Sequence, residues 1–268
     1  MQVHLVDVFT TEPGRGNPAA VVFDAGGGLS GAEMGGIAAR LGLETTFVDG
    51  TTLRYFQPSG VAMTLCGHGT LAALAVMGKK GRFSVSTPMG DLAVSADEFL
   101  YGMAMPPVRF GEPVAAEVGA RGLGIDPGQV DGPVQVVGAG RPKLIIPLRS
   151  LEALDGLQPE PAAVEEACAA TGATGLYAFT RKERVFGAMA DARHFPAGAG
   201  IYEDPVTGVA ALALAWYLWH YSVAPGCGSV KIAQGHAMGR PGMVMVRQES
   251  DGFAWIYGQA VVGGTRAL

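Results

Sequence analysis

The chain has 268 residues, of which 49% are hydrophobic and 16% are charged, and its formal net charge is −5. This length and composition exclude an intrinsically disordered chain and predict a sizeable core in one large or two medium domains. The negative charge argues against a nucleic acid or an anionic membrane as a partner, because both attract clustered Lys and Arg.

Cysteine usage and the N-terminus predict a cytoplasmic protein. Cys66, Cys168 and Cys227 form no C-x-x-C pair, so we expect reduced thiols. Met1 leads into a strand-like run without the features of a signal peptide. The longest apolar stretch, residues 209–219, is too short to span a bilayer and predicts a buried helix.

The first half of the chain shows strand patterns interrupted by one clear helix signal. Ser30 is expected to cap a helix over residues 31–41, because Glu33 follows at the spacing of a capping box. Residues 83–86 and 90–94 are expected to form a hairpin. Further strands are expected at residues 3–9, 19–23, 45–48 and 52–56.

The second half repeats this alternation of strands and helices. Residues 97–140 are rich in Pro and Gly, with a helical piece near residues 114–121, and are expected to connect the halves. Helical patterns occur at residues 150–154 and 161–171. Strands are expected at residues 143–148, 176–180, 185–191, 228–233, 243–248 and 253–262. The pattern predicts a mainly β chain with two buried helices, one in each half.

A Gly-rich turn, Leu-Cys-Gly-His-Gly-Thr at residues 65–70, leads into the apolar run 71–77. Such a turn leaves the first N–H groups of the following helix free, and these groups with the helix dipole favour an anion. His68 adds a group that can bind or move protons near neutral pH. We therefore favour a role for His68 in a site over a purely structural one.

A second turn of this kind, Asp-Pro-Val-Thr-Gly-Val at residues 204–209, lies 139 residues downstream of the first when Gly208 is placed over Gly69. The same shift aligns residues 54–56 with residues 193–195 without a gap, and residues 4–8 with residues 143–147. A duplicated unit is the simplest interpretation. Two such halves would aim two helix N-termini at one cleft, which suits a small carboxylate ligand.

Several side chains near these turns allow two interpretations. Glu44, just before an apolar strand, is either a solvated loop acid or a general acid/base tuned by burial. Asn17 is a turn residue by its spacing alone. Asp204 before Pro205 is a typical helix N-cap, which is compatible with a catalytic role. Arg54 and Arg193 align in the repeat, so a shared structural role is expected.

Other chemistries are less well supported. Cys66 and His68 could form a nucleophile and base, but alternate residues of a turn rarely face each other, so Cys66 is interpreted as a small apolar filler. His194 and His236 have no partners at metal-ligand spacing, so no metal is predicted. Residues 138–142 lack a complete dinucleotide fingerprint, which argues against a nicotinamide cofactor. We expect no cofactor.

Five segments, in order and spread over nearly the whole chain, resemble the PhzF-like family of phenazine biosynthesis, which shares its fold with diaminopimelate epimerase. They are residues 16–22 (GNPAAVV), 44–48 (ETTFV), 66–70 (CGHGT), 203–208 (EDPVTG), and 234–235 (QG) with 239–241 (GRP).

The resemblance implies an α+β fold of two pseudo-symmetric halves, each a curled, mostly antiparallel β-sheet or barrel around a central helix, with the active site between them. The first half is expected to cover residues 1–115, with a closing C-terminal strand from residues 253–268 added. The second half is expected to cover residues 116–252.

The resemblance also implies the roles of individual residues. Glu44 would take a proton from one carbon and return it to another, with His68 and Asp204 as polar partners. The substrate carboxylate would be held at the two turns, where backbone N–H groups converge. The substrate-binding positions implied are Asn17, Gly67, His68, Gly69, Gly208 and Val209.

One position departs from the family pattern: Val209 stands where the family often has Ser after Thr-Gly. Backbone donation survives this change, but a hydroxyl contact is lost. The change favours a substrate group that is less polar, or differently placed, than that of the dihydroanthranilate substrate of the phenazine enzyme.

The expected function is therefore a cofactor-independent isomerase that moves a proton, and with it a double bond, on a small carboxylate, as a homodimer. A two-thiol racemase is disfavoured because Cys66 aligns with Pro205. A one-base epimerase or racemase acting on an amino-acid-like substrate remains an alternative, and so does a non-catalytic metabolite-binding protein.

Overall fold

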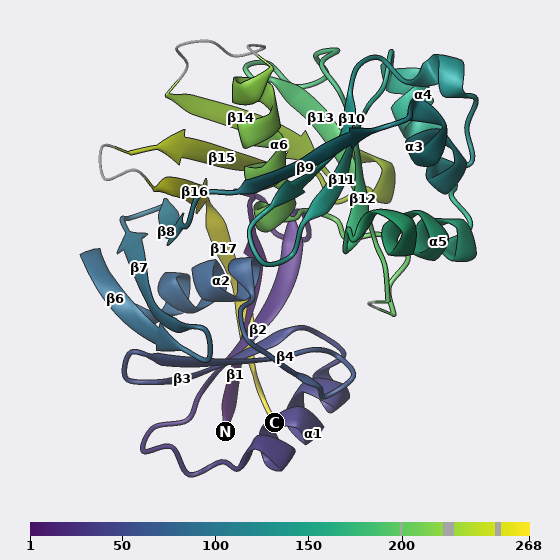
Figure 1. Ribbon diagram of the computed structural model, residues 1–268. Coiled ribbons are helices and arrows are strands. Elements are labelled where there is room, and N and C mark those ends of the chain that lie inside the picture. The colour runs from purple at the N-terminus through teal and green to yellow at the C-terminus, as the bar shows by residue number, and fades with distance from the viewer. Residues whose placement is uncertain (199, 222–227, 250–252) are drawn as a thin grey trace. The chain divides into compact units, whose positions relative to one another are not determined.

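The computed structural model describes residues 1–198, 200–221, 228–249 and 253–268, and its backbone forms two compact units (Figure 1). The first unit comprises residues 1–104 and 257–268, and the second comprises residues 105–256. The chain enters the second unit before residue 115 because β9 (Arg109–Val114) pairs with β10 (Val134–Gly138).

The first unit is a curled sheet that begins with the C-terminal strand β17 (Ala260–Ala267) beside β1 (Gln2–Val8). From β1 the order is β2, β3, β4, β6, β7 and β8, and the pairs β2–β3 and β4–β6 are parallel. The remaining elements are β2 (Asn17–Phe23), α1 (Gly31–Leu41), β3 (Thr45–Asp49), β4 (Thr52–Phe56), β5 (Ala62–Met63), α2 (Gly67–Met77), β6 (Gly81–Thr87), β7 (Gly90–Ala96) and β8 (Tyr101–Met105).

The second unit is built on a similar sheet, in the order β9, β10, β11, β12, β13, β14, β15 and β16, with parallel pairs at β11–β12 and β13–β14. Its further strands are β11 (Lys143–Pro147), β12 (Gly175–Thr180), β13 (Ala190–Pro196), β14 (Ser229–Gln234), β15 (Gly242–Gln248) and β16 (Ala254–Gly258). Its helices are α3 (Ala116–Leu123), α4 (Leu151–Asp155), α5 (Pro161–Thr171) and α6 (Gly208–His220), with 3₁₀ turns at η1 (Pro127–Gln129) and η2 (His236–Met238).

The two units repeat one pattern of strand pairing. Starting at β1 and at β10, the successive pairs are antiparallel, parallel, antiparallel, parallel and antiparallel. By this pattern β11 corresponds to β2, so the alignment of residues 4–8 with residues 143–147 was wrong. The second unit has two helices between its parallel strands where the first has only α1, and this extra chain breaks a constant shift.

One helix crosses the interior of each sheet. In Figure 1, α2 lies against β1, β2 and β17, and α6 lies against β10, β11 and β15. Both helices are apolar on all sides, which is the composition of a helix buried in a core. The fold is thus α+β, with a curled sheet around a central helix in each unit, as expected. Within the described residues, no helix is long and apolar enough to cross a membrane.

Several local expectations are confirmed and others are wrong. Ser30 and Glu33 form the expected reciprocal capping box at α1. The strand expected over residues 185–191 is instead β13, which begins at Ala190 and contains Arg193 and His194. Because β13 is buried on both faces, an apolar run is expected there, but its three polar residues, Asp191, Arg193 and His194, interrupt that pattern. Three strands, β8, β9 and β10, lie in the segment expected to be a connection.

The cysteines differ in their settings. Cys168 is a free thiol within the apolar core of the second unit, and burial raises its pKa to about 11, as fits a structural residue. Cys66 is also a buried thiol outside any disulfide, but it lies at the start of α2 among polar groups. Cys227 lies outside the described residues.

Candidate active site

The N-terminus of α2 is shaped by Cys66 and by two glycines. Cys66 is the N-cap, and its sulfur accepts a hydrogen bond from the Gly69 N–H at 3.3 Å. A Cβ atom on Gly69 would lie 2.6 Å from Thr46 Oγ1 and 2.9 Å from Cys66 Sγ, so only glycine fits. The Gly69 N–H is therefore used by the cap, while Gly67 and His68 are the first helical residues, whose N–H groups have no acceptor within the helix.

Glu44 lies directly before β3, and its side chain meets Cys66 and His68 at the start of α2. The Cys66 thiol donates a hydrogen bond to Glu44 Oε2 at 2.9 Å, and His68 Nε2 lies 3.3 Å from the same oxygen. The Glu44 side chain is 31% exposed and the His68 side chain 12% exposed. Glu44 is therefore a half-buried, partnered carboxylate rather than a solvated loop acid.

The interpretation of Cys66 as an apolar filler was wrong. Its sulfur lies 3.7 Å from His68 Nδ1, so the two side chains do face each other. They meet because the extended backbone of the N-cap at Cys66 precedes helical residues, which places the two side chains on the same side of the turn. With Glu44 they form a group of three possible metal-binding atoms, all within 4.8 Å of one another.

Asn17 lies at the beginning of a strand rather than in a turn. It is the first residue of β2, opposite Val8 of β1, and is buried. The turn-residue interpretation is therefore wrong, since the peptide of Asn17 belongs to the sheet.

In the second unit, Asp204 is not the N-cap of α6. The helix begins at Gly208, and its N-cap is Thr207. The Asp204 N–H donates to the His194 carbonyl at 3.0 Å, forming an isolated bridge to β13. This pairing ties Asp204 to β13, and the helix starts later than the Asp-Pro pattern predicts.

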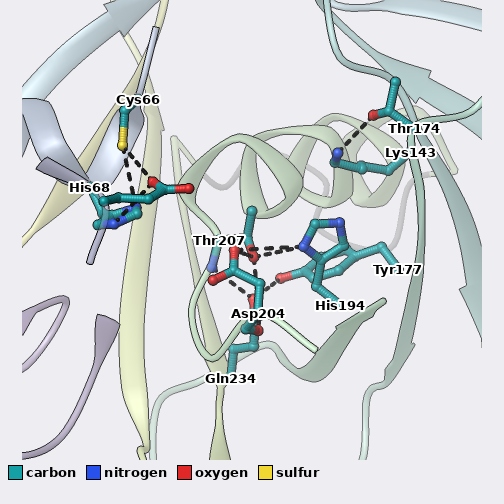
Figure 2. Close-up of polar contacts among 10 residues, drawn as sticks. Cys66, His68, Lys143, Thr174, Tyr177, His194, Asp204, Thr207 and Gln234 are labelled. Carbon is teal, nitrogen blue, oxygen red and sulfur yellow. Dashed lines mark hydrogen bonds and ion pairs between the residues drawn. The ribbon is translucent and has the colours of Figure 1, made fainter. Parts of the chain in front are cut away.

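Thr207 connects Asp204 to His194. Its hydroxyl donates to Asp204 Oδ2 at 2.5 Å and lies 2.9 Å from His194 Nδ1 (Figure 2). Because a hydroxyl has one proton, already given to Asp204, the His194 contact requires that Nδ1 carry the hydrogen. Burial lowers the pKa of His194 to about 4, which keeps the ring neutral near pH 7. His194 thus acts as a neutral donor that orients Thr207, and Thr207 orients Asp204.

Gln234, at the end of β14, holds the same loop through its amide group. Its Oε1 accepts from the Thr207 N–H at 3.1 Å and from the Tyr177 hydroxyl at 2.9 Å. Its Nε2 donates to the Asp204 carbonyl at 2.8 Å. Gln234 occurs in a segment that resembles the family, but nothing in its local pattern revealed these contacts. Thr207 and His194 were missed for the same reason, since their partners lie on other elements.

Arg54 and Arg193 have the structural role expected from the repeat. Arg54 forms an ion pair with Asp24 at 3.0 Å, and Arg193 forms a buried, two-point ion pair with Glu203. Arg193 Nη1 also donates to three backbone carbonyls, so the guanidinium is held in place by the protein itself. A hollow of about 450 Å³ lies beside Arg193 and Tyr202.

Known proteins with similar sequence cover nearly the whole chain. The family model described as phenazine biosynthesis-like protein (PhzC-PhzF) matches residues 6–264. The protein named uncharacterized isomerase YddE of Escherichia coli (strain K12) is 35% identical over 91% of this chain and 89% of its own. The trans-2,3-dihydro-3-hydroxyanthranilate isomerase of Pseudomonas aeruginosa is 30% identical over 92% of this chain and 90% of its own.

A solved structure agrees with this assignment. The Bacillus anthracis phenazine biosynthesis protein of the PhzF family has a TM-score of 0.90 and 25% identity, covering 100% of this chain and 98% of that chain. The segments that resemble the family on sequence grounds thus lie in a chain with the family's fold and with named isomerases as relatives. The protein is an isomerase, and its chain belongs to the phenazine biosynthesis-like (PhzF) family.

Proposed function

We propose that the protein is a cofactor-independent isomerase that moves a proton, and with it a double bond, on a small carboxylate metabolite, with Glu44 as the acid/base. The observation that supports this most directly is the setting of Glu44. Its carboxylate is half-buried and contacts a thiol and an imidazole at the N-terminus of a buried helix. A positioned carboxyl group of this kind is suited to carry a proton, which contributes roughly 10²–10⁴-fold to a rate.

In the proposed reaction, ionised Glu44 removes a proton from one carbon of the substrate. The electron pair left behind shifts the double bond, and protonated Glu44 then returns the proton to a different carbon, so that enzyme and proton count are restored. The substrate carboxylate accepts hydrogen bonds from the N–H groups of Gly67 and His68, where the positive end of the α2 dipole adds to the attraction. His68 and Cys66 hold Glu44 in place between the two steps.

We also assign Asp204 to the reaction as a polar partner, with Asn17 and the backbone of Gly208 and Val209 as substrate contacts. The contacts of Asp204 support this assignment, because a carboxylate held by Thr207 keeps a fixed direction. Val209 supplies an apolar side chain at the start of α6, so we expect a substrate group without a strong hydrogen-bond donor there.

The decisive experiment is proton exchange in heavy water, followed by mass spectrometry and NMR. The panel contains trans-2,3-dihydro-3-hydroxyanthranilate, other unsaturated cyclic carboxylates, and amino acids. With the wild type we expect carbon-bound deuterium or a moved double bond, and with Glu44→Gln a loss of at least about 100-fold. Glu166→Gln, at an exposed position of α5, is the control and should match the wild type. Equal activity of Glu44→Gln and wild type would remove Glu44 from the mechanism.

A one-base epimerase or racemase acting on an amino-acid-like substrate is the second candidate, because the half-buried carboxylate of Glu44 could both remove a proton from one carbon and return it to that carbon. Product stereochemistry separates the two reactions: epimerisation inverts one carbon, whereas isomerisation moves unsaturation. A metabolite-binding protein without catalysis would instead bind a panel member with equal affinity in the wild type and in Glu44→Gln, and would exchange no proton.

We further propose that the enzyme acts in the cytoplasm as a homodimer. Light scattering after size-exclusion chromatography would give the mass in solution, and a value near 27.6 kDa would instead indicate a monomer.

A further inference from the structure

Glu44, Cys66 and His68 bring together three different kinds of metal-binding atom. A carboxylate oxygen, a thiol sulfur and an imidazole nitrogen all lie within 4.8 Å of one another. Zn²⁺ takes these donors, and a site with three protein ligands leaves a fourth position for water or substrate. The set joins residue 44 to a turn 22 residues later, so only the folded first unit assembles it.

Small side-chain shifts would bring the atoms of this cluster to the separations of zinc ligands. Ligand atoms bonded to zinc at roughly 2.0–2.3 Å in a tetrahedron lie about 3.3–3.7 Å apart. Here Cys66 Sγ is 3.7 Å from His68 Nδ1 and 2.9 Å from Glu44 Oε2, and His68 Nε2 is 3.3 Å from that oxygen. Because one ion binds only one nitrogen of the ring, the 3.7 Å and 3.3 Å contacts belong to alternative arrangements, and the side chains must shift as the ion enters. The Glu44 side chain is 31% exposed, so it can rotate slightly to admit an ion.

His68 supplies an independent observation. Its Nε2 is buried and makes no hydrogen bond within the described residues, because the 3.3 Å contact with Glu44 Oε2 has unsuitable geometry. A buried polar atom without a hydrogen bond is uncommon and requires an explanation. Its direction toward the carboxylate leaves it available to a ligand placed beside Glu44.

We propose that this cluster binds Zn²⁺ reversibly as an inhibitor. Binding forms bonds from the ion to Cys66 sulfur, one His68 nitrogen and a Glu44 oxygen. The thiol proton of Cys66 passes to solvent, while the His68 nitrogen and the Glu44 oxygen each donate a lone pair to the ion. The inhibitory part rests on the proposed function, because a metal-bound Glu44 cannot accept a proton from a substrate; the binding part does not.

Cobalt(II) is the direct probe, because it takes the same ligands and absorbs visible light. The titration uses a chain with Cys168→Ala and Cys227→Ser, so that Cys66 is its only thiol. We expect about one equivalent to bind, with a thiolate-to-cobalt charge-transfer band and the strong visible bands of four-coordinate geometry. Calorimetry of zinc binding in buffers of different ionisation enthalpy should show release of about one proton.

Single substitutions test the ligands. In the same background, Cys66→Ser should abolish the charge-transfer band and weaken cobalt binding by more than about 100-fold, since losing even an outer-shell partner costs roughly 10–100-fold. Glu44→Gln and His68→Asn should each weaken binding but keep a thiolate band at high metal concentration, whereas Glu166→Gln should bind as the parent does. Binding unchanged by Cys66→Ser, or no binding at millimolar cobalt, would overturn the proposal.

Activity then separates this inference from the proposed function. Zn²⁺ at the concentration that fills the site should suppress deuterium incorporation, and EDTA should restore it. Metal binding at these three residues with an active Glu44→Gln variant would refute the proposed function and leave the metal site standing. Deuterium exchange that depends on Glu44, in an enzyme that binds no metal, would refute the metal site and leave the proposed function standing. Metal binding without loss of Glu44-dependent exchange would refute the inhibition.

Discussion

At the scale of single residues, the tightest constraint is on Gly69. Its missing side chain lets α2 start against Thr46 while Cys66 caps the helix. In the sequence it was one glycine of a Gly-rich turn, chosen as a substrate contact. In the structure its N–H binds sulfur, so its part in the site is to let Cys66 and the helix approach β3.

Gly69→Ala should therefore destabilise the protein and lower its activity. The added carbon must displace Thr46 Oγ1 or Cys66 Sγ, at a cost of about 1–3 kcal/mol in the free energy of unfolding. Gly36→Ala is the matched control, because its nearest contact would be an Arg40 nitrogen at 3.8 Å and alanine favours the helix by roughly 1 kcal/mol. Urea unfolding of both variants measures the two effects. An unchanged free energy of unfolding in Gly69→Ala would show that Thr46 and Cys66 can move apart to admit the methyl group.

At the scale of elements, the beginning of α6 depends on one hydroxyl group. Thr207 Oγ1 donates to Asp204 and receives hydrogen bonds from His194 Nδ1 and, at 3.3 Å, from Gln234 Nε2. Three elements are therefore joined at the N-cap of a helix whose cap side chain does not bond to the helix itself.

Thr207→Val should lower kcat by about 10-fold or more, because Asp204 loses the donor that sets its direction. It should also cost about 1–3 kcal/mol of stability, since the buried His194 N–H loses its acceptor. Thr207→Ser, which keeps the hydroxyl, should restore both values and the pH profile of kcat. Low activity in Thr207→Ser with normal stability would assign the role to the methyl group instead.

The cap of α1 offers a test of an element remote from the proposed chemistry. Ser30 Oγ accepts from the Glu33 N–H, and the Ser30 N–H donates to Glu33 Oε2 at 2.8 Å. Ser30→Ala should lower the free energy of unfolding by about 1 kcal/mol. Deuterium exchange by this variant should equal that of the wild type; a matching loss of activity would indicate that α1 acts on the site.

At the scale of the whole molecule, buried His194 makes stability depend on pH. Burial lowers its pKa from 6.5 to about 4, so between these values the unfolded chain binds a proton that the folded chain does not. Stability then rises with pH through this window and is lost as the pH falls from 6.5 toward 4, by roughly 3 kcal/mol in total. Urea unfolding across this range measures the slope.

His194→Gln should flatten that part of the curve, although it should also lower stability at neutral pH. His220→Gln, at an exposed position of α6, should leave the slope as in the wild type. An unchanged slope in His194→Gln would assign the acid sensitivity to other groups.

The sequence by itself determined the elements whose signals are local. The capping box at Ser30, the apolar helices α2 and α6 and most strands follow from patterns within about ten residues, and the ordered family segments predicted the fold. The bounds of strand β13 were not predicted, because Arg193 and His194 occupy buried positions where a strand pattern requires apolar side chains. A constant shift of 139 residues aligns the two Gly turns but not β2 with β11, because the second unit has two helices where the first has one.

Only the tertiary structure decided which side chains meet. Glu44 and the turn at residues 65–70 were both singled out, but the bond from Cys66 to Glu44 exists because strand pairing and helix packing bring separate segments together. Likewise Asp204 has the composition of a helix cap, and a backbone hydrogen bond to β13 prevents it from being one. Local sequence patterns report interactions between residues that are close in the chain, such as helix caps and strand alternation. A functional site is built from residues that become neighbours only after folding.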